Sequence, residues 1–223
     1  MNMKHTEKEL QALKEEVSHM WKLVLSQLEK AKQAFLNGEV ELAREIVSRE
    51  KRVDAFELKI DSDCENYIAL YSPVAVDLRL VLSLIKISIT LERIGDFAES
   101  IARHVIDRDG CLQDAQIVEE LQVEKMFDTL IGMLSDSFVA LESENTRLSG
   151  KIMAKDNEID ILYRTSFDIL TPYLQENPAR IRCGLKTILI LRKLERIGDH
   201  CNNIVEEIVF YVDAKVLKHG GGH

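Results

Sequence analysis

Apolar residues recur at intervals of three and four along nearly the whole chain of 223 residues, which is the period of amphipathic helices. Breaks at glycine, proline and asparagine divide this pattern into long segments. Helices of such length, joined by short turns, are typical of antiparallel bundles. The pattern therefore predicts an all-α fold with six long helices, over about 6–36, 39–70, 73–106, 112–148, 152–175 and 177–217.

An internal repeat organises these helices. The hexapeptide LERIGD occurs at 91–96 and again at 194–199, at equivalent points of two similar helices. The preceding helices also correspond, since EKRVD (50–54) and DNEID (156–160) occupy matching positions. We therefore predict two tandem, pseudo-symmetric antiparallel three-helix bundles with a short C-terminal tail, dividing the chain into 1–107, 112–217 and 218–223.

Acidic residues four positions apart lie beside the apolar seam on the second and third helix of each unit. Residues at this spacing lie on the same side of a helix, about 40° apart, and like charges there destabilise it by a few tenths of a kcal/mol. We expect the neighbouring bases, Arg93 and Arg196 among them, to point elsewhere. Converging carboxylates favour a hard cation. The predicted metal ligands are Glu50, Asp54, Glu92 and Asp96 for one site, and Asp156, Asp160, Glu195 and Asp199 for the other.

A single acidic pair of this kind is common on a solvated helix surface, so the prediction depends on its recurrence at repeat-equivalent positions. Carboxylate ligands narrow the metal to hard or borderline ions such as iron, manganese, magnesium or zinc. We expect His200 on the surface or at the edge of the apolar seam rather than among the ligands. Glu16 and His19 form the ExxH string of di-iron bundles, but those proteins need two copies and this chain has one.

Composition and charge exclude several classes of protein. With 29 basic and 38 acidic residues the net charge is -9, which argues against nucleic-acid binding. No stretch has the character of a signal peptide or a membrane span. The four cysteines are scattered, so we expect reduced thiols and a cytoplasmic protein. No nucleophile elbow, P-loop, dinucleotide fingerprint or HExxH motif occurs, and we expect no enzymatic activity.

The segment DLRLVLSLIKISITLERIGDFAESIA (77–102) and its degenerate second copy IRCGLKTILILRKLERIGDHCNNI (181–204) resemble the PhoU family of phosphate-transport regulatory proteins. The resemblance implies two symmetric three-helix bundles side by side, whose E(D)xxxD pairs hold multinuclear clusters of iron or zinc. It also adds Asn203, because the family often has an asparagine one turn after the last acid. The first half has Ser100 there, with Glu99 beside it, so we expect its site to differ in ligands or nuclearity.

The resemblance further implies a cytoplasmic negative regulator of phosphate uptake and of the phosphate-starvation response, the Pho regulon. Its implied partners are the ATPase subunit of the phosphate ABC transporter and a phosphate-sensing histidine kinase, so it would reach the membrane through them without inserting. We expect a homodimer. Two alternatives stay open: a carboxylate-bridged helical metalloenzyme or metal-storage protein, favoured by oxygen-dependent turnover of ferrous ion, and a purely structural adaptor, favoured by absence of metal.

Overall fold

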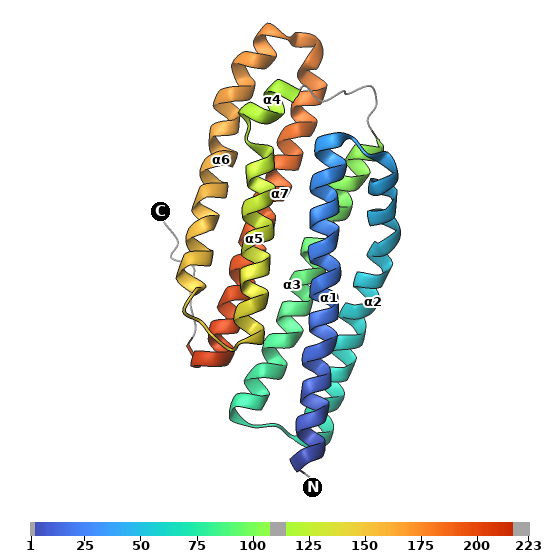
Figure 1. Cartoon of the computed structure of the whole chain (residues 1–223), viewed down its shortest axis with the longest axis vertical. Helices are drawn as coiled ribbons and strands as arrows, with labels where there is room; N and C mark the ends of the chain where they lie inside the picture. The colour runs from blue at the N-terminus through green and yellow to red at the C-terminus, as the bar shows by residue number, and fades with distance from the viewer. Residues whose placement is uncertain (1–2, 108–114, 216–223) are drawn as a thin grey trace.

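The computed structural model describes residues 3–107 and 115–215, which form helices and no β-strand (Figure 1). The all-α prediction is confirmed, while the predicted tail 218–223 lies outside the described residues. No helix in the described ranges is long and apolar enough to cross a membrane. The elements are α1 (Met3–Asn37), α2 (Val40–Tyr71), α3 (Ala75–Ile106), α4 (Ala115–Glu120), α5 (Val123–Glu142), α6 (Ser149–Glu176), the 3₁₀ turn η1 (Pro178–Arg180) and α7 (Ile181–Asp213).

The turn between α1 and α2 forms where the sequence predicts it, at Asn37–Gly38. Gly38 has a φ of 70°, in the left-handed region that glycine enters without Cβ strain. The backbone N–H of Glu39 then donates to the carbonyl of Ala34 at 3.1 Å, which satisfies a carbonyl at the end of α1. The chain reverses here, so α1 and α2 run antiparallel.

The helix predicted over 112–148 is wrong in its length, because the chain breaks at Gln122 and α5 ends at Glu142. Leu121 and Val123 are both buried. On a continuous helix these two side chains would point about 200° apart, and one of them would face solvent. Gln122 instead adopts a φ of 51°, and the resulting turn lets both side chains reach the core.

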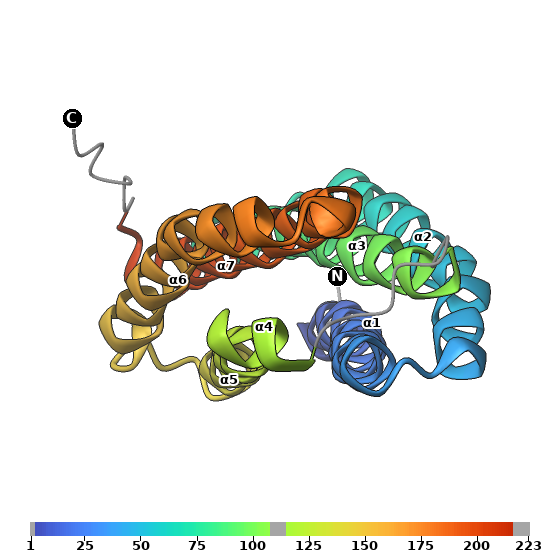
Figure 2. The same ribbon diagram turned by 90° about the horizontal axis from the view of Figure 1, so that it is seen from above.

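The helices form two layers (Figure 2). Seen from above, α6, α7, α3 and α2 follow one another in a curved outer layer, and α1 and α5 lie side by side on its concave side. Each three-helix unit therefore contributes two helices to the outer layer and one long helix to the inner layer. Helices α3 and α7, which carry the two LERIGD segments, pack against each other at the centre of the outer layer.

One apolar core runs through both units. Trp21 of α1 is fully buried, and its indole N–H donates to the carbonyl of Leu134 in α5 at 3.1 Å. In the outer layer, the Lys86 ammonium of α3 pairs with the Glu207 carboxylate of α7 at 2.9 Å. The two units are thus joined by a shared apolar core and by polar contacts in both layers.

The cysteines depart in part from the expectation of reduced thiols. Cys64 and Cys201 are free and buried, but Cys183 is disulfide-bonded. Cys111 lies outside the described residues. Spacing along the chain did not predict this bond, because tertiary packing, and not sequence separation, decides which sulfur atoms come within bonding distance.

Candidate metal centres

The packing of the outer layer places the predicted acidic pairs at two boundaries between neighbouring helices. The first centre (Glu50, Asp54, Glu92 and Asp96) lies where α2 packs against α3. The second centre (Asp156, Asp160, Glu195 and Asp199) lies where α6 packs against α7. Each centre therefore consists of one acidic pair from each of two neighbouring helices.

Glu50 is the deepest acid of the first centre, with 6% of its surface exposed. Its Oε2 accepts a hydrogen bond from Gln27 Nε2 of α1 at 3.0 Å, while its Oε1 is buried without a hydrogen-bond partner. Burial raises the pKa of Glu50 to about 7, opposed by the bond from Gln27 and helped by the charges of Asp96, Glu99 and Asp54. A buried carboxylate with an unsatisfied oxygen is costly unless something pairs with it.

The remaining acids of the first centre lie nearer to solvent. Glu92 and Asp96 are half-buried, and Asp54 is exposed. Burial is the main cause that raises the pKa of Glu92, and the charge of Asp96 adds to it. Burial also raises the pKa of Asp96, and the charge of Asp54 on the facing helix contributes. These mutual effects mean that carboxylates from α2 and α3 are close enough to repel one another.

The second centre opens into a cavity of about 520 Å³. Asp156 is its deepest acid, 9% exposed, and its Oδ2 accepts a hydrogen bond from Asn202 Nδ2 of α7 at 2.6 Å. Asp160 and Asp199 are half-buried at its rim. The cavity is lined by Gly150, Met153, Ala154, Asp156, Asn157, Asp160, Asp199 and Asn202.

Glu195 completes the second centre from the side of α7. Its Oε1 accepts a hydrogen bond from the Arg192 guanidinium at 2.7 Å, and its Oε2 is buried without a hydrogen-bond partner. Burial raises the pKa of Glu195, as do the charges of Asp199 and Asp160, although Arg192 lowers it. The predicted ligand Asn203 is half-buried, one turn of α7 beyond Asp199.

The expectation that the neighbouring bases point away from the acids is wrong for Arg93 and Arg196. The Arg93 guanidinium lies 3.6 Å from the carboxylate of Asp96, and that of Arg196 lies 3.7 Å from the carboxylate of Asp199. In both cases the base precedes the acid by three residues, a spacing that a long arginine stem spans on a helix. These arginines are 58% and 46% exposed, so each pair contributes little to stability.

The donor atoms suit a hard cation, but the side chains do not form a ready-made site. Among residues 3–107 and 115–215, no three histidine, cysteine or acidic side chains are gathered to hold a metal ion. Each centre nevertheless offers carboxylates from two helices and one buried oxygen without a hydrogen-bond partner, at Glu50 and Glu195. Metal binding at either centre therefore stays a prediction.

Four residues that shape these centres were missed by sequence reasoning: Gln27, Asn202, and the glycines of the two LERIGD segments, Gly95 and Gly198. Gln27 is fully buried on the apolar face of α1. A polar residue at a position of the apolar repeat was therefore the sequence signal that could have revealed it. For the glycines the signal was their presence at the same point of both repeats.

His200 lies between the two units and not among the acids. Its ring packs on the ring of Phe97 from α3, with 5.7 Å between the centroids. Burial, followed by the charge of Arg196, lowers its pKa. Phe97 directly follows Asp96 in the chain and His200 directly follows Asp199, so this contact joins the neighbours of one acid from each centre.

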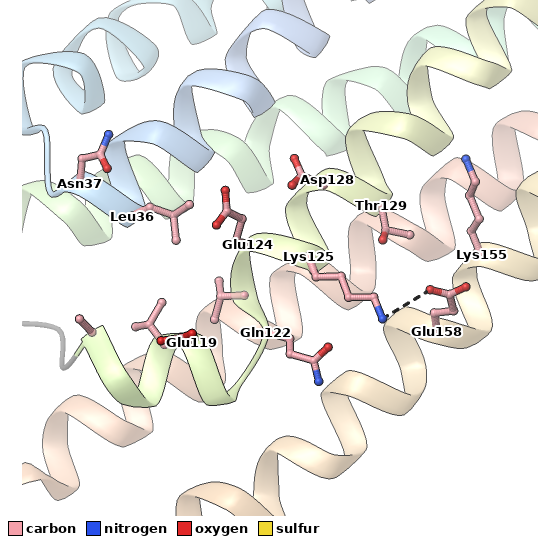
Figure 3. A pocket seen from close by; sticks show the side chains of 13 residues that line it. Leu36, Asn37, Glu119, Gln122, Glu124, Lys125, Asp128, Thr129, Lys155 and Glu158 are labelled. Carbon is pink, nitrogen blue, oxygen red and sulfur yellow. Dashed lines mark ion pairs between the residues drawn. The ribbon is translucent and has the colours of Figure 1, made fainter.

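A cavity of about 970 Å³ lies elsewhere, between the end of α1 and helices α4, α5 and α6 (Figure 3). Its lining mixes charges of both signs, and the Lys125 ammonium lies 4.0 Å from the Glu158 carboxylate. The acids Glu124 and Asp128 both pair with Lys32. Because most of its acids already have lysine partners, this cavity lacks the concentration of like charge that marks the two centres.

Comparison with known proteins places the chain in a family. The PhoU domain family matches it twice, over residues 17–105 and 123–208. The chain is 33% identical to the "Phosphate-specific transport system accessory protein PhoU homolog" of Aquifex aeolicus, covering 95% of each chain. It is 32% identical to the corresponding Escherichia coli protein, covering 96% of this chain and 88% of that one. The crystal structure of PhoU from Pseudomonas aeruginosa superposes with a TM-score of 0.88 at 30% identity, covering 94% of this chain and 99% of that one. By sequence along nearly its whole length and by fold, this chain belongs to the PhoU family.

Proposed function

We propose that this protein is a cytoplasmic regulator that restrains phosphate uptake and the phosphate-starvation response. It acts by contact, linking the ATPase subunit of a phosphate ABC transporter to a sensor histidine kinase, and needs no catalysis of its own. The names of its relatives support this role, since those of Escherichia coli and Aquifex aeolicus are called accessory proteins of the phosphate-specific transport system.

The observation that carries the metal-binding part of the proposal is the unsatisfied carboxylate in each centre. Glu50 and Glu195 each keep one buried oxygen without a hydrogen-bond partner, beside further acids of the facing helix. A bound iron or zinc ion would supply positive charge that cancels the repulsion among these carboxylates. Glu50, Asp54, Glu92 and Asp96 would hold it in the first centre, and Asp156, Asp160, Glu195, Asp199 and Asn203 in the second.

Exposed apolar side chains on the same helix faces as the acids support docking onto other proteins. Leu82 of α3 and Leu185 of α7 occupy equivalent positions of the repeat and are 38% and 59% exposed. Each lies about four turns before the last acid of its LERIGD segment, within roughly 40° of it around the helix. Acidic and apolar groups thus share one face of each unit, and exposed apolar groups often mark sites of protein association.

A deletion strain tests the regulatory role. Loss of the gene should leave phosphate uptake and alkaline phosphatase expression high in phosphate-rich medium, because nothing then restrains either. Expression of the wild-type chain from a plasmid should restore repression. Normal uptake and normal phosphatase levels in the deletion strain would remove the proposal.

Metal content tests the centres. We expect mass spectrometry to find iron or zinc in protein purified without chelator, and a large loss in the variant Glu92→Ala, Asp96→Ala, Glu195→Ala, Asp199→Ala. A matched control removes four exposed acids of other surfaces, Glu29→Ala, Glu65→Ala, Asp168→Ala and Glu176→Ala, and should keep its metal. Unchanged stoichiometry in the first variant would rule out the site assignment.

Two further measurements test the metalloenzyme alternative and the oligomeric state. Oxygen-dependent turnover of ferrous ion by the purified protein would replace the regulator with a metalloenzyme or a metal store. Light scattering during gel filtration checks the proposed homodimer, for which we expect about twice the 25.5 kDa mass of the chain. A monomer at micromolar concentration would contradict the homodimer without affecting the metal centres.

A further inference from the structure

The glycine of each LERIGD segment lies directly against a carboxylate of the neighbouring helix. A Cβ atom built on Gly95 would lie 3.0 Å from Glu50 Oε1 and 3.3 Å from Val53 Cγ1. A Cβ built on Gly198 would overlap Asp156 Oδ1. Neither glycine has a positive φ, so what each supplies is space and not an unusual backbone conformation.

The same two carboxylates are held on their other side by an amide. Gln27 donates to Glu50 Oε2, and Asn202 donates to Asp156 Oδ2. One oxygen of each carboxylate is therefore fixed by a hydrogen bond, while the other lies against the backbone of α3 or α7. The two units differ in the acid and in the helix that supplies the amide, yet both keep the glycine and the carboxylate in contact.

We infer that Gly95 and Gly198 are positioning residues of the two metal centres, an inference that rests on the metal binding proposed above. Each glycine immediately precedes an acid of the same centre, Asp96 or Asp199. The absence of a Cβ lets the carboxylate of the facing helix approach this point, so that acids from two helices converge on one cation. With a Cβ in place, Asp156 must swing out of the seam and away from Asp199.

A second glycine of α7, Gly184, provides a matched control for Gly198. A Cβ on Gly184 would lie 2.7 Å from Leu174 Cδ1 and Cδ2, a clash with an apolar side chain of α6. Gly184 and Gly198 thus both permit close packing of α6 on α7, but only Gly198 faces a carboxylate. Alanine at either position should disturb packing, whereas alanine at Gly198 alone should disturb metal binding.

The experiment isolates the second centre in a parent protein that carries Glu92→Ala and Asp96→Ala. After chelator treatment, Zn²⁺ binding is measured by calorimetry, and retained zinc by mass spectrometry. Gly198→Ala should weaken Zn²⁺ binding by roughly tenfold or more, the usual effect of losing a group that orients a ligand. Gly184→Ala should lower the melting temperature while leaving the Zn²⁺ affinity within about twofold of the parent. Equal affinity of the parent and Gly198→Ala would overturn the inference, and so would an equal loss in Gly184→Ala.

The first centre keeps the inference testable if Gly198→Ala does not fold. Here the nearest atom to the added Cβ is the flexible end of Glu50, so Gly95→Ala needs only a small shift. In a parent carrying Glu195→Ala and Asp199→Ala, we expect Gly95→Ala to weaken Zn²⁺ binding. Adding Glu50→Asp, which withdraws the carboxylate by one methylene, should restore part of the affinity. No loss in Gly95→Ala, or a loss without rescue, would contradict the positioning role.

The outcomes distinguish this inference from the proposed function. If the unmodified chain binds no Zn²⁺, metal binding fails and the inference fails with it. If the parents bind Zn²⁺ and the glycine variants bind it equally well, the centres stand and only the role of the glycines is lost.

Discussion

The two carboxylate centres are built on the same plan with different parts. In the first, the buried acid is Glu50 and its amide donor, Gln27, comes from α1, a third helix. In the second, the buried acid is the shorter Asp156 and its donor, Asn202, lies on α7 itself. The longer glutamate reaches toward a donor in the inner layer, whereas the aspartate finds one on the helix that it packs against.

The features that the two centres share indicate which parts of the arrangement are required. Both keep a glycine beneath the carboxylate and an acid directly after that glycine. The acid's length and the source of its amide vary, because a hydrogen-bond donor can be supplied from several directions. A Cβ has no such freedom, since the carboxylate of the facing helix already occupies the space that the Cβ would need.

The largest change in stability is expected from Trp21→Ala, which tests whether the two units unfold as one cooperative structure. Loss of the buried indole and of its bond to Leu134 should lower the free energy of unfolding by about 3–5 kcal/mol. Because the core is continuous, the buried thiols of Cys64 and Cys201, one in each unit, should become reactive at the same denaturant concentration. Exposed His19→Ala is the control and should change stability by less than about 0.5 kcal/mol. Separate labelling transitions would show that the units unfold independently.

The next largest change in stability is expected from removing the charge of Glu50 in metal-free protein. Its folded pKa of about 7 lies above the usual 4.5, so the folded state binds a proton that the unfolded state has released between these pH values. Wild-type stability therefore falls as the pH rises through this window. At pH 8, Glu50→Gln should be more stable than wild type by about 2–3 kcal/mol in urea unfolding with chelator present.

The pH dependence provides the check on this prediction. The advantage of Glu50→Gln should shrink as the pH falls toward 4.5, and saturating Zn²⁺ should reverse the order at pH 8, because the cation binds the wild-type carboxylate. Exposed Glu29→Gln should show neither behaviour. A constant difference between wild type and Glu50→Gln at every pH would contradict the raised pKa.

A somewhat smaller loss is expected from Gln27→Leu, which removes the amide of the first centre at nearly constant volume. Glu50 would then have no hydrogen bond to either oxygen, at a cost of about 1.5–3 kcal/mol at pH 8. Gln33→Leu, on an exposed position of the same helix, is the matched control. Equal urea midpoints for these two variants would mean that the amide does not hold Glu50, and the common plan of the two centres would lose its support.

The smallest effects should come from the arginines that accompany the acids. Arg192→Gln and Arg93→Gln remove partly exposed ion pairs and should change stability by less than about 1 kcal/mol. Each should raise Zn²⁺ affinity a few-fold at its own centre, because a competing positive charge is removed. The rise should be greater for Arg192, which is 2.7 Å from Glu195, than for Arg93, which is 3.6 Å from Asp96. Calorimetry at low and high salt checks this; a rise that does not diminish at high salt would argue against an electrostatic cause.

The helices could be predicted because their signals are local. Apolar period and punctuation, such as the turn at Gly38, specify where most helices begin and end. The break at Gln122 was missed because it depends on where Leu121 and Val123 find the core, which is a tertiary condition. The disulfide of Cys183 was missed for the same reason.

Sequence spacing also indicated which acids share a helix face, but not how deep each lies. Glu50 and Asp54 are one turn apart on α2, yet Glu50 is buried and Asp54 is exposed. The difference arises because α1 brings Gln27 against Glu50, a contact between residues far apart in the chain. The burial of an acid sets the direction of its pKa shift and decides whether one of its oxygens lacks a hydrogen-bond partner. These properties of each centre therefore depend on tertiary packing and not on sequence spacing.

The tilted rings of Phe97 and His200 form a direct contact between the two halves. Each ring follows an acid in the chain, Asp96 on one side and Asp199 on the other, and each is fixed to that acid by a single peptide unit. Because Phe97 directly follows Asp96, a rotation of α3 that moved the Asp96 carboxylate would also move the Phe97 ring against the His200 imidazole of α7. Were both centres to bind an ion, this contact is the place where occupancy in one half would be coupled to the affinity of the other.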